Sequence, residues 1–315
     1  MAYEDMKKHE NAPLRFASLA EAHRALGLPG PLHPLISLMR NARPPGQGNG
    51  PARPHVLGFY KVSFWPKQRR TLQYGQGYYD FEAGGLLFAA PGQLLGGTPE
   101  PEAEEACAHV TLLIHPDFLA SYPLAKKIRE YGFFTYAAHE ALHVSEPERE
   151  VLLALFRTME AELASRLDEF SQDVVIAQLD LLLTYANRFY KRQFLTRKAV
   201  HSDLLQRLEA TLADGFRPER LAGQGIPTVH YLAQQLHVSP SYLSDMLRTL
   251  TGQSAQQHIH NKLIEQAKEQ LAATSLSVSE VAYALGFEHP QSFSRFFKTK
   301  TTLSPLAFRR SFQLN

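Results

Sequence analysis

The chain has 315 residues, a length that accommodates two ordinary domains whose cores are large enough to fold without disulfides or metals. Hydrophobic residues make up 44% and charged residues 20% of the sequence, which is typical of a soluble globular protein, and no stretch approaches the roughly 20 apolar residues of a membrane span. The net charge of +2 gives no indication of a nucleic-acid partner.

The first ten residues are polar, so no secretory signal is expected. The single cysteine, Cys107, excludes an internal disulfide and a cysteine-cluster metal site, and it suits a small buried side chain in a reducing cytosol. We therefore expect a cytoplasmic protein without a membrane partner.

The amino-terminal part begins with a predicted helix and a loop. Residues 18–28 have the pattern of a short amphipathic helix, with Ser18 as its cap and Glu21 at the capping-box spacing. Residues 41–54 are too rich in proline and glycine for a helix or strand, and we predict a surface loop. Residues 56–114 alternate aromatic or β-branched runs with turn sequences, which predicts the short strands of a small sandwich or barrel.

The period becomes helical after Ile114. Ser145 and Glu148 form a second capping-box pair ahead of an apolar stripe, and another stripe follows it. The two helices pack either as core against the strands or as a dimer seam. The stripes consist of Leu152, Leu155, Phe156, Met159, Leu163 and Leu167, and of Val174, Val175, Leu179, Leu182, Leu183, Ala186 and Phe189.

A short basic run at 189–198 is the expected connection between two domains. We accordingly predict an amino-terminal domain at 1–190, a linker at 191–201 and a carboxy-terminal domain at 202–315, in which everything is helical.

An internal repeat lies within the carboxy-terminal domain. Residues 228–238 match residues 277–287 at an offset of 49, and residues 241–254 match residues 291–304 at an offset of 50. One extra residue in the second turn explains the change. The matched pairs include Leu232 with Val281, Ala233 with Ala282, Leu236 with Leu285, Leu243 with Phe293, Ser244 with Ser294, Leu247 with Phe297, and Arg248 with Lys298.

Each copy has the pattern of a helix-turn-helix. A small alanine between apolar residues lets the first helix approach the second closely, and a three-to-four-residue turn follows, in which Gly286 favours a positive φ. Pro240 and Pro290 suit the first turn of the second helix in each copy. Residues 257–274 form a strong helix that holds the copies at a fixed separation, as required for two recognition helices to enter successive major-groove segments.

The residue types predicted to point outward agree with a DNA surface. In the second recognition helix, Gln291 and Arg295 are suited to reading adenine and guanine. Asp245 takes the place of Arg295 in the first copy, where it either accepts from cytosine, orients a neighbouring arginine or faces water as a cap. The segment 289–315 is basic and has no acidic residue, so it is either a phosphate-binding patch or a solvated tail; its cations are Arg295, Lys298, Lys300, Arg309 and Arg310.

Residues 202–312 closely resemble the AraC family of bacterial regulators, most clearly in LAQQLHVSPSYLSDMLRTLTGQS and SLSVSEVAYALGFEHPQSFSRFFKTKTTLSP. The resemblance implies a seven-helix domain that binds double-stranded DNA through recognition helices at 240–250 and 290–299. Thr302 departs from the family by standing where glycine is usual, and His237 replaces a more usual turn residue. The expected DNA-binding residues are Ser239, Ser241, Ser244, Asp245, Arg248, His289, Gln291, Ser294, Arg295 and Lys298.

The amino-terminal part resembles the effector domain that many members of this family carry, a cupin-like double-stranded β-helix, or jelly-roll barrel, with a helical dimerisation hairpin at about 145–190. The expected fold is thus α+β with a barrel, followed by an all-α tandem helix-turn-helix with a linker helix. The resemblance implies a transcription regulator that forms a homodimer, works with RNA polymerase and responds to a small molecule.

If the barrel binds a ligand, its aromatic residues are the expected walls of the site; the alternative is that they are ordinary core and sheet surface. Strand alternation separates Tyr60 from Lys61 and Trp65 without revealing which face is inward. The candidate residues are Tyr60, Lys61, Trp65, Tyr74, Tyr78, Tyr79 and Gln93.

The sequence allows two alternatives to a ligand-controlled regulator. A metal-dependent cupin enzyme needs a histidine and carboxylate cluster, but His109 is the one histidine between 56 and 114, and His258 and His260 point to different sides of a helix. We therefore expect no enzymatic activity, cofactor or metal. The remaining alternative is a DNA-binding regulator that is switched by a partner or by its own abundance.

Overall fold

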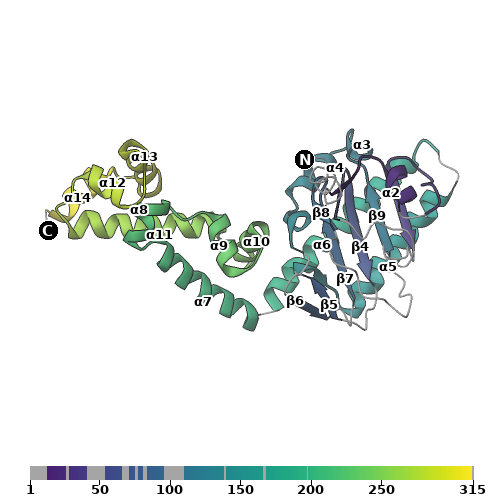
Figure 1. Ribbon diagram of the computed structural model, residues 1–315, viewed down its shortest axis with the longest axis horizontal. Coiled ribbons are helices and arrows are strands. Elements are labelled where there is room, and N and C mark those ends of the chain that lie inside the picture. Colours follow the sequence, from purple (N-terminus) through teal and green to yellow (C-terminus); the bar gives the residue numbers. More distant parts are fainter. Residues whose placement is uncertain are drawn as a thin grey trace, which may run out of the picture. The chain divides into compact units, whose positions relative to one another are not determined.

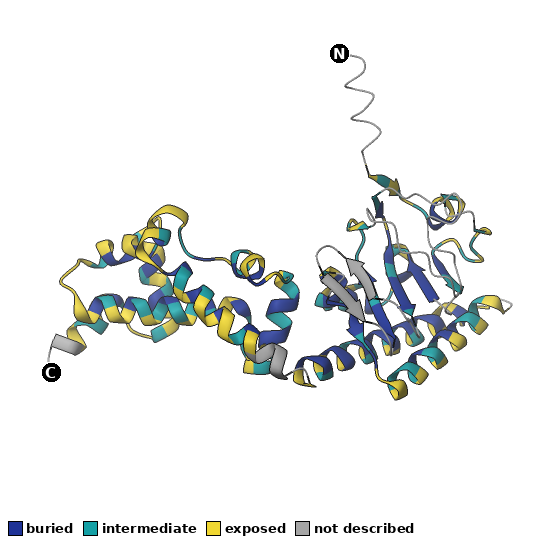
Figure 2. Cartoon of the chain, turned by 60° about the horizontal axis from the view of Figure 1, so that its bottom comes forward, coloured by how far each residue is buried: buried dark blue, intermediate teal, exposed yellow. Residues whose placement is uncertain are grey.

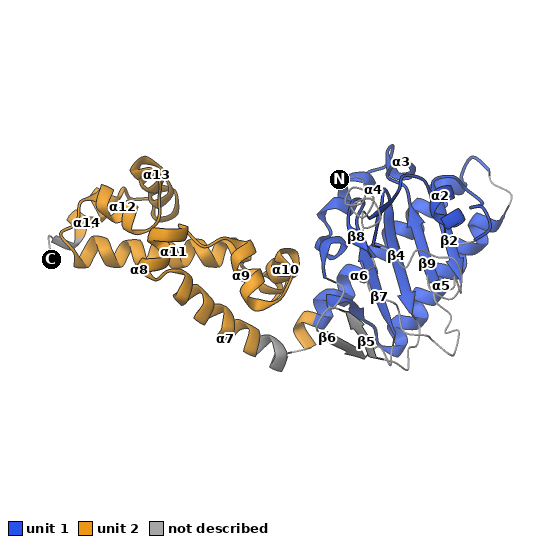
Figure 3. Cartoon of the chain, viewed as in Figure 1, with its two compact units in different colours: residues 1–193 blue, residues 194–315 orange. Residues whose placement is uncertain are grey.

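The computed structural model describes residues 13–25, 28–40, 54–65, 71–74, 77–80, 84–95, 110–137, 140–165, 168–196 and 198–313. It divides into two compact units, Met1–Gln193 and Phe194–Asn315 (Figure 3). Each unit has buried residues of its own (Figure 2), and most of them are hydrophobic. The division into an amino-terminal domain at 1–190, a linker at 191–201 and a carboxy-terminal domain at 202–315 stays a prediction.

The described residues of the amino-terminal unit form three sheets, which Figure 1 shows. The largest is antiparallel, with the order β10-β7-β4-β9-β2, and consists of β2 (Ile36–Arg40), β4 (Tyr60–Trp65), β7 (Gly85–Ala89), β9 (Val110–Ile114) and β10 (Leu142–His143). In the second sheet, β1 (Leu14–Phe16) pairs in parallel with β3 (His55–Leu57), which pairs with β8 (Leu94–Leu95). The third is the hairpin of β5 (Thr71–Tyr74) and β6 (Gly77–Asp80).

Helices cover one face of the five-stranded sheet. Alternation on β4 directs Tyr60, Val62 and Phe64 to this face, and all three side chains are buried. Phe64 stacks on Phe156 of α5 (Glu146–Ala164) with ring centroids 5.6 Å apart. The second covering helix is α6 (Ser171–Thr196), and Figure 1 shows both running along the sheet. This face is the main apolar core of the unit.

The predicted helical stripes are largely buried in that core. Backbone N–H of Ser145 donates to Glu148 Oε2 at 2.9 Å, so the predicted capping box is confirmed. Leu155 and Leu163 are partly buried, Val174 is 40% exposed, and Leu167 lies outside the described residues. The stripe residues with buried side chains are Leu152, Phe156, Met159, Val175, Leu179, Leu182, Leu183, Ala186 and Phe189.

The opposite face of the sheet is mixed in polarity. Near β2 it is closed by a buried cluster of Leu19, Ala22, Leu57, Phe59 and Leu113, to which α2 (Leu19–Ala25) contributes. Glu21 Oε2 accepts from the backbone N–H of Ala17 at 2.9 Å, and Ser18 Oγ accepts from that of Glu21 at 3.3 Å, which confirms the predicted cap of this helix. The loop predicted at 41–54 lies outside the described residues except for Pro54.

Short helices link the sheet to the hairpin of long helices. They are α3 (Pro116–Leu119), α4 (Leu124–Lys127) and two 3₁₀ turns, η1 (Ile128–Glu130) and η2 (Gly132–Thr135). Phe134 of η2 packs edge-on against Tyr60 with ring centroids 5.0 Å apart, so η2 belongs to the helical layer. Sheets with helices on one face are therefore observed in this unit.

The carboxy-terminal unit is helical throughout its described part. Eight helices lie between 198 and 313, one more than the family resemblance implies, because the short α8 is present. The predicted linker run at 189–198 is helical as far as Thr196. The helices are α7 (Lys198–Gly215), α8 (Pro218–Gln224), α9 (Val229–Leu236), α10 (Pro240–Thr251), α11 (Ala255–Ala273), α12 (Val278–Ala284), α13 (Pro290–Thr301) and α14 (Pro305–Gln313). Across the described ranges of both units, no helix is long and apolar enough to cross a membrane.

Candidate nucleic-acid interface

The first helix-turn-helix consists of α9 and α10. Thr228 Oγ1 accepts from the backbone N–H of Tyr231 at 3.1 Å and thereby caps α9, whose Leu232, Ala233 and Leu236 are buried. His237 ends the helix in left-handed backbone with a φ of 56°. The small alanine and the turn stand where the repeat predicts them.

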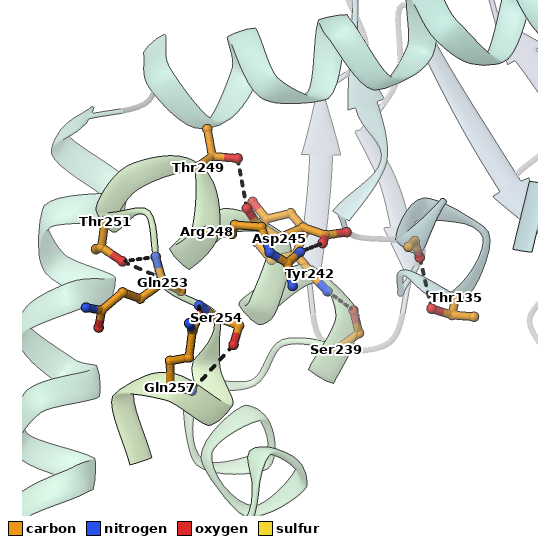
Figure 4. Close-up of polar contacts among 11 residues, drawn as sticks. Thr135, Ser239, Tyr242, Asp245, Arg248, Thr249, Thr251, Gln253, Ser254 and Gln257 are labelled. Atoms are coloured by element: carbon orange, nitrogen blue, oxygen red, sulfur yellow. Dashed lines mark hydrogen bonds and ion pairs between the residues drawn. The ribbon is translucent and has the colours of Figure 1, made fainter. Parts of the chain in front are cut away.

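Ser239 begins the first recognition helix. Its Oγ accepts from the backbone N–H of Tyr242 at 3.2 Å, and Pro240 follows in the first turn (Figure 4). Leu243 and Leu247 are fully buried, so the inward face is the predicted one. Ser239, which was expected to contact DNA, therefore has a capping role that stabilises α10.

Asp245 and Arg248 form an ion pair on the exposed side of α10. Arg248 Nη1 donates to Asp245 Oδ1 at 2.9 Å (Figure 4). The arginine side chain is 59% exposed and the aspartate side chain 32%. Of the three roles open to Asp245, orientation of a neighbouring arginine is supported by this ion pair.

The linker helix α11 begins with a capping box. The backbone N–H of Ser254 donates to Gln257 Oε1 at 2.7 Å (Figure 4). One face of α11 is buried through Ile259, Leu263 and Leu271, as its apolar stripe predicts.

The two histidines of α11 have separate surroundings. His258 Nε2 lies 3.0 Å from Thr251 Oγ1. Gln256 Nε2 lies 2.9 Å from His260 Nε2, and the His260 ring packs against Phe296 of α13. Burial lowers the pKa of both imidazoles, and Lys300 lowers that of His260 further. Within the described ranges no group of three metal-binding side chains is present.

The second helix-turn-helix consists of α12 and α13. Backbone N–H of Ser277 donates to Glu280 Oε2 at 2.6 Å, and this bond lowers the pKa of the glutamate. Val281 and Ala282 of α12 are fully buried.

Gly286 connects these helices in left-handed backbone with a φ of 83°. A Cβ atom at this glycine would lie 3.2 Å from the backbone of Gly225 and Ile226, in the segment between α8 and α9. Glycine is therefore required twice over, by its φ and by the close approach of two backbones. The sequence indicated the first reason and gave no sign of the second.

The second recognition helix, α13, presents a basic outer side. Phe293 and Phe297 are fully buried, whereas Gln291, Arg295 and Lys298 are exposed, as predicted. His289 precedes the helix in extended backbone, and its side chain makes no capping bond. Ser294, the remaining expected contact on this helix, is partly buried.

The two recognition helices differ in charge. Asp245 and Arg248 balance each other on α10, whereas α13 has three cations and no acidic residue. Ser241 and Ser244, the other residues expected to contact DNA from α10, are partly buried and uncharged.

One of the five cations predicted for the basic patch has a structural contact instead. Arg309 Nε donates to the carbonyl of Leu271 at 3.1 Å, near the end of α11, and its Nη2 is buried. This guanidinium satisfies one of the last carbonyls of the helix. Sequence reasoning missed the contact because the two residues are far apart in the chain.

The predicted effector residues do not form one group. Tyr60 belongs to the helix-covered face, while Lys61 and Trp65 lie on the opposite face of β4. Gln93 Oε1 accepts from the backbone N–H of Ala90 at 3.2 Å within a turn. The side chains of Tyr74, Tyr78 and Tyr79, like His109 and Cys107, are outside the described part of the chain.

The family model that matches this chain lies within the carboxy-terminal unit. The family described as "Helix-turn-helix domain" matches residues 232–311. An uncharacterised HTH-type transcriptional regulator of Bacillus subtilis, YobQ, is 33% identical over 84 residues, which are 27% of this chain and 35% of that protein. The arabinose operon regulatory protein of Salmonella typhimurium is 37% identical over 78 residues, which are 25% of this chain and 28% of that protein.

A solved structure aligns with about a third of the chain. The crystal structure of the DNA-binding domain of AdpA, the global transcriptional factor, in complex with a target DNA is 28% identical to it, covers 34% of this chain and 93% of that one, and gives a TM-score of 0.30. The chain spans about a third of the length of the curated relatives it matches. The repeated helices, their turns and these sequence matches lead to one conclusion: the carboxy-terminal unit of this chain is a helix-turn-helix domain of the AraC type.

Proposed function

We propose that the chain is a sequence-specific DNA-binding regulator of transcription. The observation that carries this proposal is the pair of capped helix-turn-helix units, α9–α10 and α12–α13, joined by the single helix α11. Two recognition helices at a fixed separation suit a double-stranded DNA site of two successive major-groove segments.

The outward residues of α13 are suited to different contacts with DNA. Arg295 is suited to a bidentate contact with guanine and Gln291 to one with adenine, while Lys298 neutralises phosphate. On α10, Arg248 is the exposed cation, and the hydroxyls of Ser241 and Ser244 are suited to base edges or phosphates. Ser239 and His289 stand at helix starts, where backbone N–H groups favour phosphate.

The first prediction concerns Arg295→Ala. The residue is exposed and its neighbours Phe293 and Phe297 form the core contact, so folding should be unaffected. Loss of a bidentate guanine contact costs about 1–3 kcal/mol, so specific affinity should fall roughly 5-fold to 150-fold at fixed salt. The measurement is a binding titration against sites found by genome-wide footprinting of the intact protein.

Lys262→Ala is the control, because it removes one cation from α11, outside both recognition helices, where it is partly exposed and paired with Glu265. Equal affinities for Arg295→Ala, Lys262→Ala and the unaltered protein, with one shared sequence preference, would contradict the assignment of α13.

We further propose that the amino-terminal unit is a cupin-like domain whose small-molecule ligand contacts the mixed face of the five-stranded sheet. Cross-strand register aligns Ser63 with Thr111 and Leu87 on this face, beside Lys61. Ser63 is completely buried, and its Oγ has no hydrogen-bond partner. A buried hydroxyl without a partner costs about 1–3 kcal/mol, which a ligand with a polar group would recover.

The same proposal includes a homodimer. α6 carries the apolar residues Val174 and Leu181 in exposed positions, seven residues apart on one side of the helix, and Phe170 just before it is 62% exposed. An apolar strip of this kind suits a second copy of the helical hairpin. A dimeric regulator working with RNA polymerase would act in the cytoplasm.

The enzyme alternative has little in its favour. The relatives of the carboxy-terminal unit are transcriptional regulators, and the mixed sheet face carries hydroxyls and one lysine rather than a histidine and carboxylate cluster among its described residues. A regulator switched by a partner or by abundance is the competing function, and a thermal shift that depends on a small molecule would separate the two.

A further inference from the structure

The first recognition helix differs from the second in how its cation is held. Asp245 and Arg248 are the only charged residues of α10, whereas α13 has Arg295, Lys298 and Lys300 and no carboxylate. A helix without net charge attracts phosphate weakly, so α10 is poorly suited to non-specific binding.

The geometry of the pair fixes the arginine. Asp245 lies three residues before Arg248, so both side chains stand on the same side of the helix, and the distance from Oδ1 to Nη1 is 2.9 Å. The carboxylate is the less exposed partner, at 32% against 59%, so the guanidinium extends past it toward solvent. A guanidinium has five N–H donors in a rigid plane, and this bond engages only one of its nitrogens.

The helix holds the backbone of Asp245 in place. Leu243 and Leu247 anchor α10 in the core, and Thr249 Oγ1 donates to the carbonyl of Asp245 at 2.8 Å (Figure 4). The aspartate side chain is short and has few rotamers, whereas an arginine held by nothing loses considerable freedom when it binds. The ion pair therefore holds the Arg248 guanidinium at a defined position on α10 before DNA binds.

We infer that Asp245 is a positioning residue that orients Arg248 for base reading, so that α10 selects sequence while α13 supplies most of the attraction to phosphate. This inference rests on the proposed function. It also explains why an acidic residue stands on a surface that faces polyanionic DNA: the aspartate lowers general affinity and increases discrimination.

The test uses the full chain with Asp245→Ala, Asp245→Asn and Arg248→Ala, alone and as the Asp245→Ala/Arg248→Ala pair. Each protein is measured for sequence preference on a randomised library built around a footprinted site, and for the salt dependence of binding. Glu265→Gln is the matched control, because Glu265 forms the same kind of pair, three residues from Lys262, on α11.

Asp245→Ala is expected to lower discrimination about tenfold at the bases next to α10 and nowhere else. Because it frees one cation for phosphate, the slope of log K against log salt should become steeper by about 0.9. Asp245→Asn keeps an acceptor for the guanidinium and should retain more of the preference than Asp245→Ala. In the Arg248→Ala background, removal of Asp245 should have no further effect on preference.

Three results would overturn the inference. The first is an Asp245→Ala protein with the preference and salt slope of Glu265→Gln. The second is an equal loss of discrimination from Asp245→Ala whether or not Arg248 is present, which would mean that Asp245 contacts a base directly. The third is an unaltered protein with no sequence preference at all, which would overturn the proposed function with it; the first two leave that function standing.

Discussion

Left-handed backbone occurs at equivalent residues of the two repeats. His237 and Gly286 occupy the two turns, and Gly252 and Thr302 end the two recognition helices, with φ values of 56°, 83°, 75° and 65°. In each pair one copy has glycine and the other has a side chain. Left-handed backbone costs an L-residue roughly 1–2 kcal/mol, and a β-branched residue is the least suited to it. Thr302 is therefore the more strained of the two non-glycine residues.

Thr302→Gly should stabilise the protein. Relief of the left-handed conformation outweighs the greater chain entropy of glycine, for a net gain of about 0.5–1 kcal/mol in the free energy of unfolding. Denaturant unfolding of the full chain gives the value.

Thr299→Gly is the control, because Thr299 lies within α13 in ordinary helical backbone, where glycine brings no relief. A Thr302→Gly protein that is no more stable than the unaltered chain would mean that its backbone is not strained.

The expectations for single residues were correct where neighbours in sequence determine the conformation. They failed where a side chain contacts a residue far away in the sequence. The turn glycine, the capping serines and the inward phenylalanines follow from neighbours in sequence. For Asp245 the sequence left three roles open, because a side chain three residues away offers a contact but does not guarantee it. The interpretation of Arg309 as a cation of the basic surface patch was wrong, because its Nε donates to the carbonyl of Leu271. That acceptor is 38 residues earlier in the chain, so the sequence gives no sign of the contact.

Among whole elements, α11 was the most predictable, since a long apolar stripe indicates it; its capping box at Ser254 was not predicted. The short α8 was not predicted, because its seven residues include a proline and a glycine and have too little periodicity to stand out. What the stripe of α11 did not reveal is that a polar side chain on the same side of the helix, His260, packs on Phe296 of α13.

The α11 to α13 contact should weaken in acid. Burial first and Lys300 second lower the pKa of His260 in the folded protein, so the unfolded chain takes up a proton first as the pH falls below about 6.5. Stability is thus fully present above that pH and declines through the interval down to the lowered folded pKa.

His260→Gln should flatten this decline in a series of unfolding temperatures between pH 7.5 and 5. His230→Gln, on the exposed side of α9, is the control and should follow the unaltered protein. If His260→Gln and the unaltered protein lose stability in parallel, the titration lies elsewhere.

For the whole molecule, the sequence predicted a sheet-containing part followed by a helical part. It did not predict which face of the sheet is covered by helices. Alternation along β4 defines two faces, and only helices some 90 residues later decide which one is covered. As a result the expected effector residues were divided, and Ser63, on the face away from the helices, was not singled out.

The ligand proposal predicts a stabilisation that depends on Ser63. A ligand at 100 times its Kd raises the free energy of unfolding by about 2.7 kcal/mol, which is visible as a thermal shift when the full chain is screened against pools of small metabolites. Ser63→Ala should abolish or greatly reduce the shift, and without ligand it should leave stability unchanged or raised, because it removes a buried hydroxyl without a partner.

Ser37→Ala is the contrasting control. Ser37 Oγ lies 2.9 Å from Nε2 of the buried His23, whose Nδ1 donates to the carbonyl of Pro29 at 2.6 Å, so Ser37→Ala should lower stability without ligand. An undiminished shift in Ser63→Ala would place the ligand elsewhere, and the absence of any shift across broad pools would favour a regulator switched by a partner or by abundance.

The backbone contact between Gly225 and Gly286 constrains the DNA as well as the protein. It joins the segment before the first helix-turn-helix to the turn of the second, so α11 is not the only connection between the two halves. With two connections, the halves do not swivel independently about a flexible joint. One base pair inserted between the two half-sites would rotate one against the other by about 35°, and the double helix, rather than the protein, would have to twist or bend to restore the match.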